Sequence, residues 1–177
     1  YPDDSLALHT DAYELSMMQT YWKQGLANRR AVFEAFFRKM PFQNGYAVFA
    51  GLDHIIRYVK QLHFTDSDID YLKSTNQFDE DFLEYLRNFK FTGSIRSFEE
   101  GDFVFNHEPI FQVDAPIIEG QLIETAVLNI LNYQIMVATK ASRIKAIVGD
   151  QSVMEFGSRR AQELDAAIWG TRAAYIG

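Results

Sequence analysis

The 177-residue chain contains no cysteine, and this absence already narrows its chemistry. Without thiols it can form neither disulfides nor thiolate metal sites, and such a composition is compatible with a reducing cytoplasm. No apolar run approaches the roughly 20 residues that a membrane-spanning helix needs. The first residues, Tyr-Pro-Asp-Asp, also lack the cationic start and apolar stretch of a signal peptide. We therefore expect a cytoplasmic protein that does not enter a membrane.

Basic residues are scarce as well, because 17 Lys and Arg stand against 24 Asp and Glu and give a formal net charge of −7. From Lys140 onward, however, basic side chains outnumber acidic ones, so the acidic excess belongs to the preceding part of the chain. A nucleic-acid-binding protein needs an extended basic face, which this distribution does not provide. A local group of cations suits a small anionic substrate in one pocket.

What the chain does contain is apolar and aromatic material, at 47% and 15% of its residues, enough for a substantial core. Its periodicity changes along the sequence, from helical spacing to short strands and back. It predicts helices at 12–24, 52–59, 66–72, 79–88, 117–148 and 160–175, with a break near 132–133, and strands at 31–37, 94–98, 102–105, 110–113 and 152–156. This order favours an α+β domain with an antiparallel sheet that leads into an α/β unit.

The most informative stretch is MEFGSRRAQ at residues 154–162. An apolar run stops at Gly157, Arg159 and Arg160 follow, and a helix-like pattern begins. Glycine lets the backbone turn or approach a ligand closely, and arginine offers a rigid fork of donors to carboxylate or phosphate. The residue types alone are compatible with an anion site between strand and helix, or with a turn whose arginines are solvated or salt-bridged.

Residues 155–162 resemble the E-F-G-S-R-R-A-Q motif of the nicotinate phosphoribosyltransferase family. TDAYELSMM at 10–18 is similar to the family's N-terminal T-D-x-Y-x-x-x-M segment. Two further blocks of the family are also matched. One consists of FFRKMPF and GYAVFAGL within residues 36–52, and the other of ETAVLN and ATK within residues 124–140. Four blocks in the family's order are far more specific than one short motif. By this resemblance the chain is identified as a member of the family.

The resemblance implies an N-terminal α/β domain with the antiparallel sheet, which we place at residues 1–130. Residues 131–177 would begin an irregular β/α barrel, of which only the first strand and helix are present. One such unit cannot close a barrel, so we expect the front part of a longer enzyme. The catalytic residues are not assigned here, since the resemblance places a phosphorylated histidine beyond residue 177.

The implied reaction joins nicotinate to phosphoribosyl pyrophosphate, giving nicotinate mononucleotide and pyrophosphate in NAD salvage. ATP hydrolysis drives it, and Mg²⁺ neutralises the pyrophosphate. The 177 residues alone would be inactive. Alternatives are the related nicotinamide or quinolinate phosphoribosyltransferases, or a non-catalytic dimerisation fragment if the chain truly ends at 177. The block at 155–160 differs from the quinolinate enzyme, and Arg160-Ala161-Gln162 points away from the nicotinamide enzyme.

The resemblance also gives roles to residues of this motif. Phe156 would stack on the pyridine ring, and Arg159 would meet the anionic part of the bound mononucleotide. Arg160 would join this substrate site. From the residues alone, Phe156 could instead be a core phenylalanine, and Arg160 could pair with Glu163 or Asp165.

Three further substrate-binding candidates lie outside the motif. In related enzymes the tyrosine equivalent to Tyr13 crosses the subunit interface and covers the other ring face, which implies a homodimer with shared active sites. Asp11 would belong to the same site, although it could simply cap a helix. Lys140 and Arg143 are one helical turn apart and could reach a phosphate, or lie on a solvated face. The four histidines show no ligand spacing, and we expect no metal site.

Overall fold

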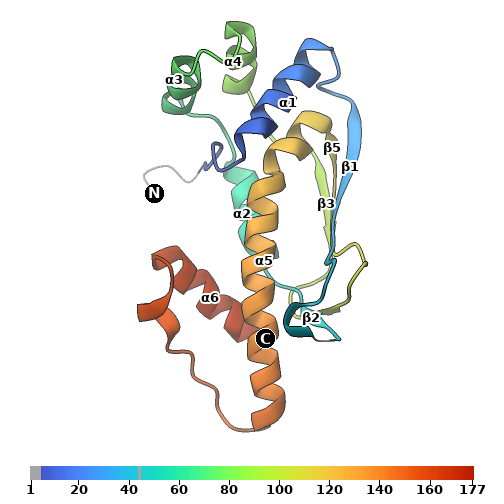
Figure 1. Ribbon diagram of the computed structural model, residues 1–177, viewed down its shortest axis with the longest axis vertical. Helices are drawn as coiled ribbons and strands as arrows, with labels where there is room; N and C mark the ends of the chain where they lie inside the picture. Colours follow the sequence, from blue (N-terminus) through green and yellow to red (C-terminus); the bar gives the residue numbers. More distant parts are fainter. Residues whose placement is uncertain (1–4, 44) are drawn as a thin grey trace. The chain divides into compact units, whose positions relative to one another are not determined.

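The computed structural model describes residues 5–43 and 45–177. The Tyr-Pro-Asp-Asp start and Asn44 lie outside the described residues. The chain mixes helix and strand, as its periodicity predicts (Figure 1). In order the elements are α1 (Ala12–Lys23), β1 (Arg30–Ala35), η1 (Pro41–Gln43), β2 (Ala47–Val48), α2 (Leu52–Gln61), α3 (Asp66–Ser74), α4 (Glu80–Arg87), β3 (Ser94–Ser97), β4 (Phe103–Val104), β5 (Phe111–Pro116), α5 (Ile117–Val148), η2 (Gly157–Arg160) and α6 (Leu164–Ile176).

The strands form two small sheets, and the chain divides into two compact units. β1, β5 and β3 make a three-stranded sheet in that order, and β2 pairs with β4 in antiparallel register. The first unit comprises Tyr1–Phe33, Asp53–Arg96 and Gln112–Val127, and the second comprises Glu34–Leu52, Ser97–Phe111 and Leu128–Gly177. The domain boundary predicted between residues 130 and 131 rests on the family resemblance and not on packing within the chain, so it stays a prediction.

The first unit packs helices around aromatic and aliphatic side chains. Trp22 of α1 lies 5.9 Å, between ring centroids, from the buried Phe82 of α4. The predicted start of α3 is confirmed by a capping box, in which Asp68 N donates to Thr65 Oγ1 at 3.1 Å and Thr65 N donates to Asp68 Oδ2 at 2.8 Å. Such a box satisfies two helix-end donors at once.

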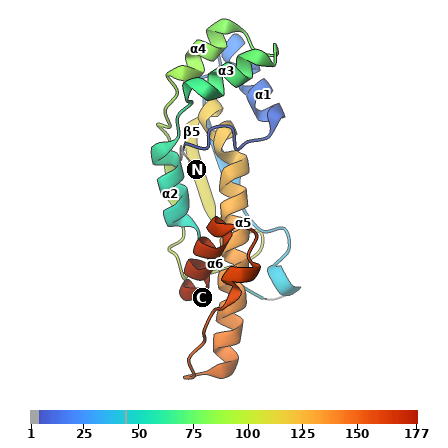
Figure 2. The ribbon, with the colours of Figure 1, turned by 90° about the vertical axis from the view of Figure 1, so that its left-hand side faces the viewer.

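The second unit is held together by polar contacts as well as by its core. Val48 N of β2 donates to the buried Thr139 Oγ1 of α5 at 2.9 Å. Arg172 of α6 donates to both carboxylate oxygens of Glu100, at 2.9 and 2.5 Å, and Gly51 N donates to the same carboxylate at 2.8 Å. Figures 1 and 2 show α6 lying along the C-terminal half of α5, where Ala173 and Ala138 share a buried cluster.

α5 is one continuous helix of 32 residues, so the break predicted near Asn132 and Tyr133 is wrong. Between Gln121 and Val148 the helix has neither glycine nor proline, and nothing in its backbone forces a kink. By length and composition α5 could cross a membrane, but half of its most apolar stretch is buried inside the structure. This is weak evidence for a membrane span, because the core helix of a soluble protein passes the same test.

The strand predicted at residues 152–156 is absent from the structure, and this part of the prediction is corrected. A strand needs a hydrogen-bonded neighbour, and no residue that the structure describes pairs with this segment. The segment continues instead into the short η2, and α6 begins at Leu164 rather than at residue 160. Of the expected barrel unit, the structure therefore contains the helix and not the strand.

Candidate functional site

The EFGSRR segment forms a solvent-exposed turn between α5 and α6. The side chain of Phe156 is 72% exposed and contributes nothing to the described core. Met154, two residues earlier, is 73% exposed. Both large apolar groups lie open to a ligand or to another polypeptide.

The two arginines of the turn carry unneutralised charge. Both are exposed, and neither Arg159 nor Arg160 forms an ion pair or hydrogen bond with any residue that the structure describes. Pairing of Arg160 with Glu163 or Asp165, one of the two sequence interpretations, is therefore not seen. Free guanidinium groups next to an exposed aromatic ring suit a flat anionic ligand.

A cavity of about 950 Å³ lies in the second unit, between the C-terminal half of α5, the segment leading to the turn, and α6. Most of its walls are apolar, and Lys140 lies among them. Its lining includes Phe42, Tyr133, Lys140, Val153, Glu155 and Thr171. A smaller adjoining cavity of about 240 Å³ is lined by Arg160 together with Glu155 and Thr171.

Lys140 and Arg143 approach the same aromatic ring, as their one-turn spacing allows. Lys140 Nζ lies 5.1 Å from the centroid of the Phe42 ring, and Arg143 Cζ lies 6.0 Å from it. Cations at such distances are attracted by the ring, with about 0.5–1 kcal/mol at exposed sites. Neither cation forms an ion pair with a residue in the described ranges. Sequence reasoning missed Phe42 as a site residue, although it belongs to one of the family blocks.

Phe42 has an uncommon backbone conformation, with φ 58° and ψ 23°. This left-handed region disfavours side chains with a Cβ and costs of order 1–3 kcal/mol. The next residue, Gln43, is also left-handed at φ 52°. Local sequence gives no signal for this geometry, because neither residue is a glycine or an asparagine.

Asp11 and Tyr13 belong to the first unit, at the start of α1. Asp11 occupies the N-cap position, but its side chain makes no capping bond to the helix. Its carboxylate instead accepts from Thr125 Oγ1 at 3.4 Å, and its backbone N–H donates to the same hydroxyl at 3.4 Å. The side-chain cap that the sequence suggested is thus replaced by a contact between two of the family blocks.

The surroundings of Tyr13 are acidic. Glu14, which is fully buried and accepts a hydrogen bond from Gln121 Nε2, raises the pKa of Tyr13 to about 12 by hydrogen bonding and by its charge. Burial, followed by the charges of Glu14 and Asp11, raises the pKa of Glu124. Tyr13 is 55% exposed, so it presents a neutral phenol ring to the exterior of the first unit at physiological pH.

None of these carboxylates forms a metal centre. Throughout residues 5–43 and 45–177, no group of three or more His, Asp or Glu side chains has an arrangement that could hold a metal ion.

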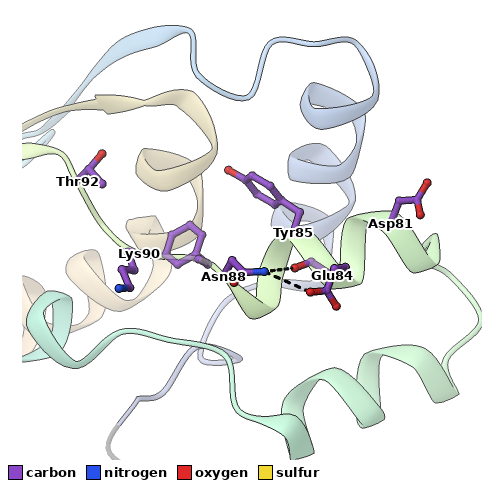
Figure 3. A pocket seen from close by; sticks show the side chains of 7 residues that line it. Asp81, Glu84, Tyr85, Asn88, Lys90 and Thr92 are labelled. Carbon is purple, nitrogen blue, oxygen red and sulfur yellow. Dashed lines mark hydrogen bonds between the residues drawn. The ribbon is translucent and has the colours of Figure 1, made fainter.

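A separate hollow of about 390 Å³ lies in the first unit, beside α4 (Figure 3). Figure 3 shows Tyr85 and Glu84 on the helix, with Lys90 on the segment that follows. Asn88 Nδ2 donates to the carbonyl and the carboxylate of Glu84 at 3.1 and 3.3 Å, and burial followed by the charge of Glu119 raises the pKa of Tyr85. No candidate site residue lines this hollow, and we assign it no role.

A family model and the curated relatives of this chain point to one family. The family model described as the nicotinate phosphoribosyltransferase (NAPRTase) N-terminal domain matches residues 8–132. Nicotinate phosphoribosyltransferase of Bacillus subtilis (strain 168) is 58% identical over 177 residues, which are 100% of this chain and 36% of that protein. The Caenorhabditis elegans nicotinate phosphoribosyltransferase is 41% identical over 180 residues, 98% of this chain and 32% of the relative.

A solved structure gives the same result. The crystal structure of human nicotinic acid phosphoribosyltransferase matches with a TM-score of 0.86 and 35% identity, over 94% of this chain and 34% of the human chain. The chain thus spans about a third of the length of the relatives that it matches.

Proposed function

We propose that this chain, which belongs to the nicotinate phosphoribosyltransferase N-terminal domain family, is part of an enzyme that joins nicotinate to phosphoribosyl pyrophosphate. The products are nicotinate mononucleotide and pyrophosphate, and the enzyme acts as a transferase in NAD biosynthesis. The observation that supports this most is the exposed Phe156 followed by an unpaired Arg159, within a chain that matches a nicotinate phosphoribosyltransferase along its whole length.

The chemistry asks the protein to hold two anionic molecules in line. Phe156 stacks on the pyridine ring, a contact that contributes about 0.5–1.5 kcal/mol beyond the burial of area. The Arg159 fork binds the anionic part of the mononucleotide, at about 1.5–3 kcal/mol for a charge-assisted hydrogen bond. Arg160 and Lys140 add positive charge nearby. Alignment of two reactants in this way lowers the barrier through proximity and electrostatic stabilisation.

Tyr13 supplies the other face of the pyridine site from a second subunit, with Asp11 beside it. The protein is then a homodimer with shared active sites. What supports this is the exposure of the Tyr13 ring on the first unit. A neutral ring can approach a nicotinate carboxylate without the repulsion that a phenolate would cause.

We include ATP and Mg²⁺ in the reaction because the family resemblance implies them. The described residues offer no carboxylate or histidine cluster for a resident metal, so Mg²⁺ is assigned to the pyrophosphate of the substrate. Coupling to ATP hydrolysis would class the enzyme as a ligase, and we assign it to residues outside this chain. A cysteine-free enzyme of this kind fits the cytoplasm.

The direct test is turnover by the natural protein that contains this sequence. With phosphoribosyl pyrophosphate, ATP and Mg²⁺ present, we expect mononucleotide from nicotinate and at least tenfold lower kcat/KM, about 1.4 kcal/mol, for nicotinamide and quinolinate. Preferential use of quinolinate or nicotinamide would replace this proposal with one of the related activities.

The 177 residues by themselves should be inactive. Titration of nicotinate against this chain, followed by calorimetry, should show no binding at micromolar concentration, because the remaining part of the site is absent. Micromolar binding would contradict this view. Turnover of none of the three pyridines by the natural protein would leave a non-catalytic dimerisation role.

A further inference from the structure

We infer that Glu155 is a positioning residue, whose carboxylate fixes the turn of residues 156–160 onto α6 and so orients Phe156 and Arg159. The inference rests on the proposed function of those two side chains. Its evidence is a pair of hydrogen bonds. Gly157 N donates to Glu155 Oε1, and Thr171 Oγ1 of α6 donates to Glu155 Oε2 at 2.9 Å.

Both oxygens of the Glu155 carboxylate thereby accept a hydrogen bond, one from the turn and one from α6. One holds the first residue of η2 by its backbone, and the other holds the middle of α6. Because the carboxylate is charged, it accepts hydrogen bonds more strongly than a neutral oxygen does. The rest of the turn is exposed, and neither the Phe156 ring nor the Arg159 guanidinium has a ring contact, hydrogen bond or ion pair with a residue that the structure describes.

The glycine of the motif agrees with this arrangement. A Cβ added to Gly157 would overlap Glu155 Oε1, whereas the backbone of Gly157 is not in the left-handed region. Glycine therefore leaves room here for the approach of the carboxylate, and its own torsion angles do not require it. Alanine would fit the backbone and push away only the end of a flexible side chain.

The location of the carboxylate also favours a positioning role over a chemical one. Glu155 lines both the large cavity and the small adjoining one, but its two oxygens are engaged with protein donors. Arg160 lines the small cavity without pairing to it. A negative charge held in this way supports the turn, while the arginines remain free for an anion.

The test combines hydrogen exchange, which reports on the turn, with enzyme kinetics, which report on nicotinate binding. In the natural protein, hydrogen exchange of the Gly157 amide should be slow in the wild type, and Glu155→Ala and Gly157→Ala should each accelerate exchange at position 157 about tenfold. In the natural protein, Glu155→Ala should raise the nicotinate KM about tenfold with kcat nearly unchanged, because binding geometry and not chemistry is lost.

Glu155→Gln separates positioning from charge. Its amide oxygen can still accept from Gly157 N, so most of the amide protection and of the KM should return; a variant as poor as Glu155→Ala would overturn the positioning role. Asp165→Asn, which removes an exposed charge in the first turn of α6, is the matched control and should leave both readouts unchanged. Fast exchange of the wild-type Gly157 amide would sink the inference by itself, whereas absence of nicotinate turnover in the wild type would instead remove the proposed function.

Discussion

Phe156 and Phe49 belong to the same unit of the chain and have opposite environments. Phe49 is completely buried next to β2, whereas Phe156 is 72% exposed in the turn before α6. Exposed aromatic rings of this size gain little for folding and are available for binding. The difference between structural and ligand-binding phenylalanines can therefore be tested by a pair of substitutions.

We predict that Phe156→Ala raises the nicotinate KM of the natural protein severalfold, since a stacking contact contributes about 0.5–1.5 kcal/mol. Its melting temperature should change by less than about 1 °C, because the ring is not packed. Phe49→Ala, the control, should lower the free energy of unfolding by about 3–5 kcal/mol. Thermal melts and steady-state kinetics decide this, and an unchanged KM in Phe156→Ala would end the stacking assignment.

Tyr58 gives a prediction about alkaline stability. Burial raises its pKa above the ordinary value of 10, and its hydroxyl has no hydrogen-bond partner within the described ranges. The folded state then keeps this proton where the unfolded state loses it, so stability is complete below pH 10 and falls as the pH rises through the folded pKa. The pKa of Tyr13, raised to about 12, acts in the same direction.

Tyr58→Phe should remove part of the loss of stability at alkaline pH. At pH 7 the substitution should leave the free energy of unfolding unchanged or raise it by up to about 1 kcal/mol, because an unpaired buried hydroxyl costs energy. Between pH 10 and 12 the variant should lose less stability than the wild type. Urea titrations across this range supply the measurement, and parallel curves for the two proteins would contradict the cause assigned here.

Some residues of the candidate site could be proposed from the sequence and others could not. Phe156, Arg159 and Arg160 stand in one contiguous motif, so reading the chain was enough to propose them. Phe42 depends on a left-handed backbone and on a helix far along the chain, and Glu155 depends on contacts with Gly157 and Thr171. Such roles arise from tertiary geometry, which local residue preferences do not encode.

Among the elements, those with their own local signals were predicted well. The capping box at Thr65 and the positive φ of Gly25 and Gly149 mark helix ends that sequence chemistry defines. Two of the errors concern elements whose structure depends on their neighbours. α5 stays continuous because contacts along its length, such as Tyr133 Oη to the Ala166 carbonyl at 2.7 Å, support it. Residues 152–156 do not form a strand because no described residue pairs with them.

The Phe42 ring of η1 lies near Lys140 and Arg143 of α5, and we expect it to position these two cations. Phe42→Leu should raise the KM for phosphoribosyl pyrophosphate about two- to fivefold, because loss of the ring frees Lys140 and Arg143 from about 0.5–1 kcal/mol of cation–π attraction. Phe42→Trp, which keeps an aromatic face, should stay within about twofold of the wild type. Kinetics of the natural protein at varied ionic strength provide the measurement. Equal values for the two variants would show that the ring does not position the cations.

For the whole molecule, the residues of the proposed site fall into two groups. Tyr13 and Asp11 lie in the first unit, where the blocks at 10–18 and 124–129 meet through Asp11 and Thr125. Phe156, Arg159 and Lys140 lie in the second. A homodimer with shared sites requires that one subunit supply the first group and its partner the second. A variant of the first group and a variant of the second should therefore complement each other when their subunits mix.

Mixing variants tests this directly. Tyr13→Ala and Phe156→Ala proteins should each bind nicotinate poorly, but subunit exchange between them would create mixed dimers in which one of the two sites has both aromatic residues. In an equal mixture with free exchange, about a quarter of the sites are then intact, since half of the dimers are mixed. We expect high-affinity nicotinate turnover to recover toward that fraction, as measured at nicotinate concentrations well below the KM of either variant. A mixture that only averages the activities of its two components would show that Tyr13 and Phe156 act within the same subunit or at different places, and the shared-site dimer would have to be abandoned.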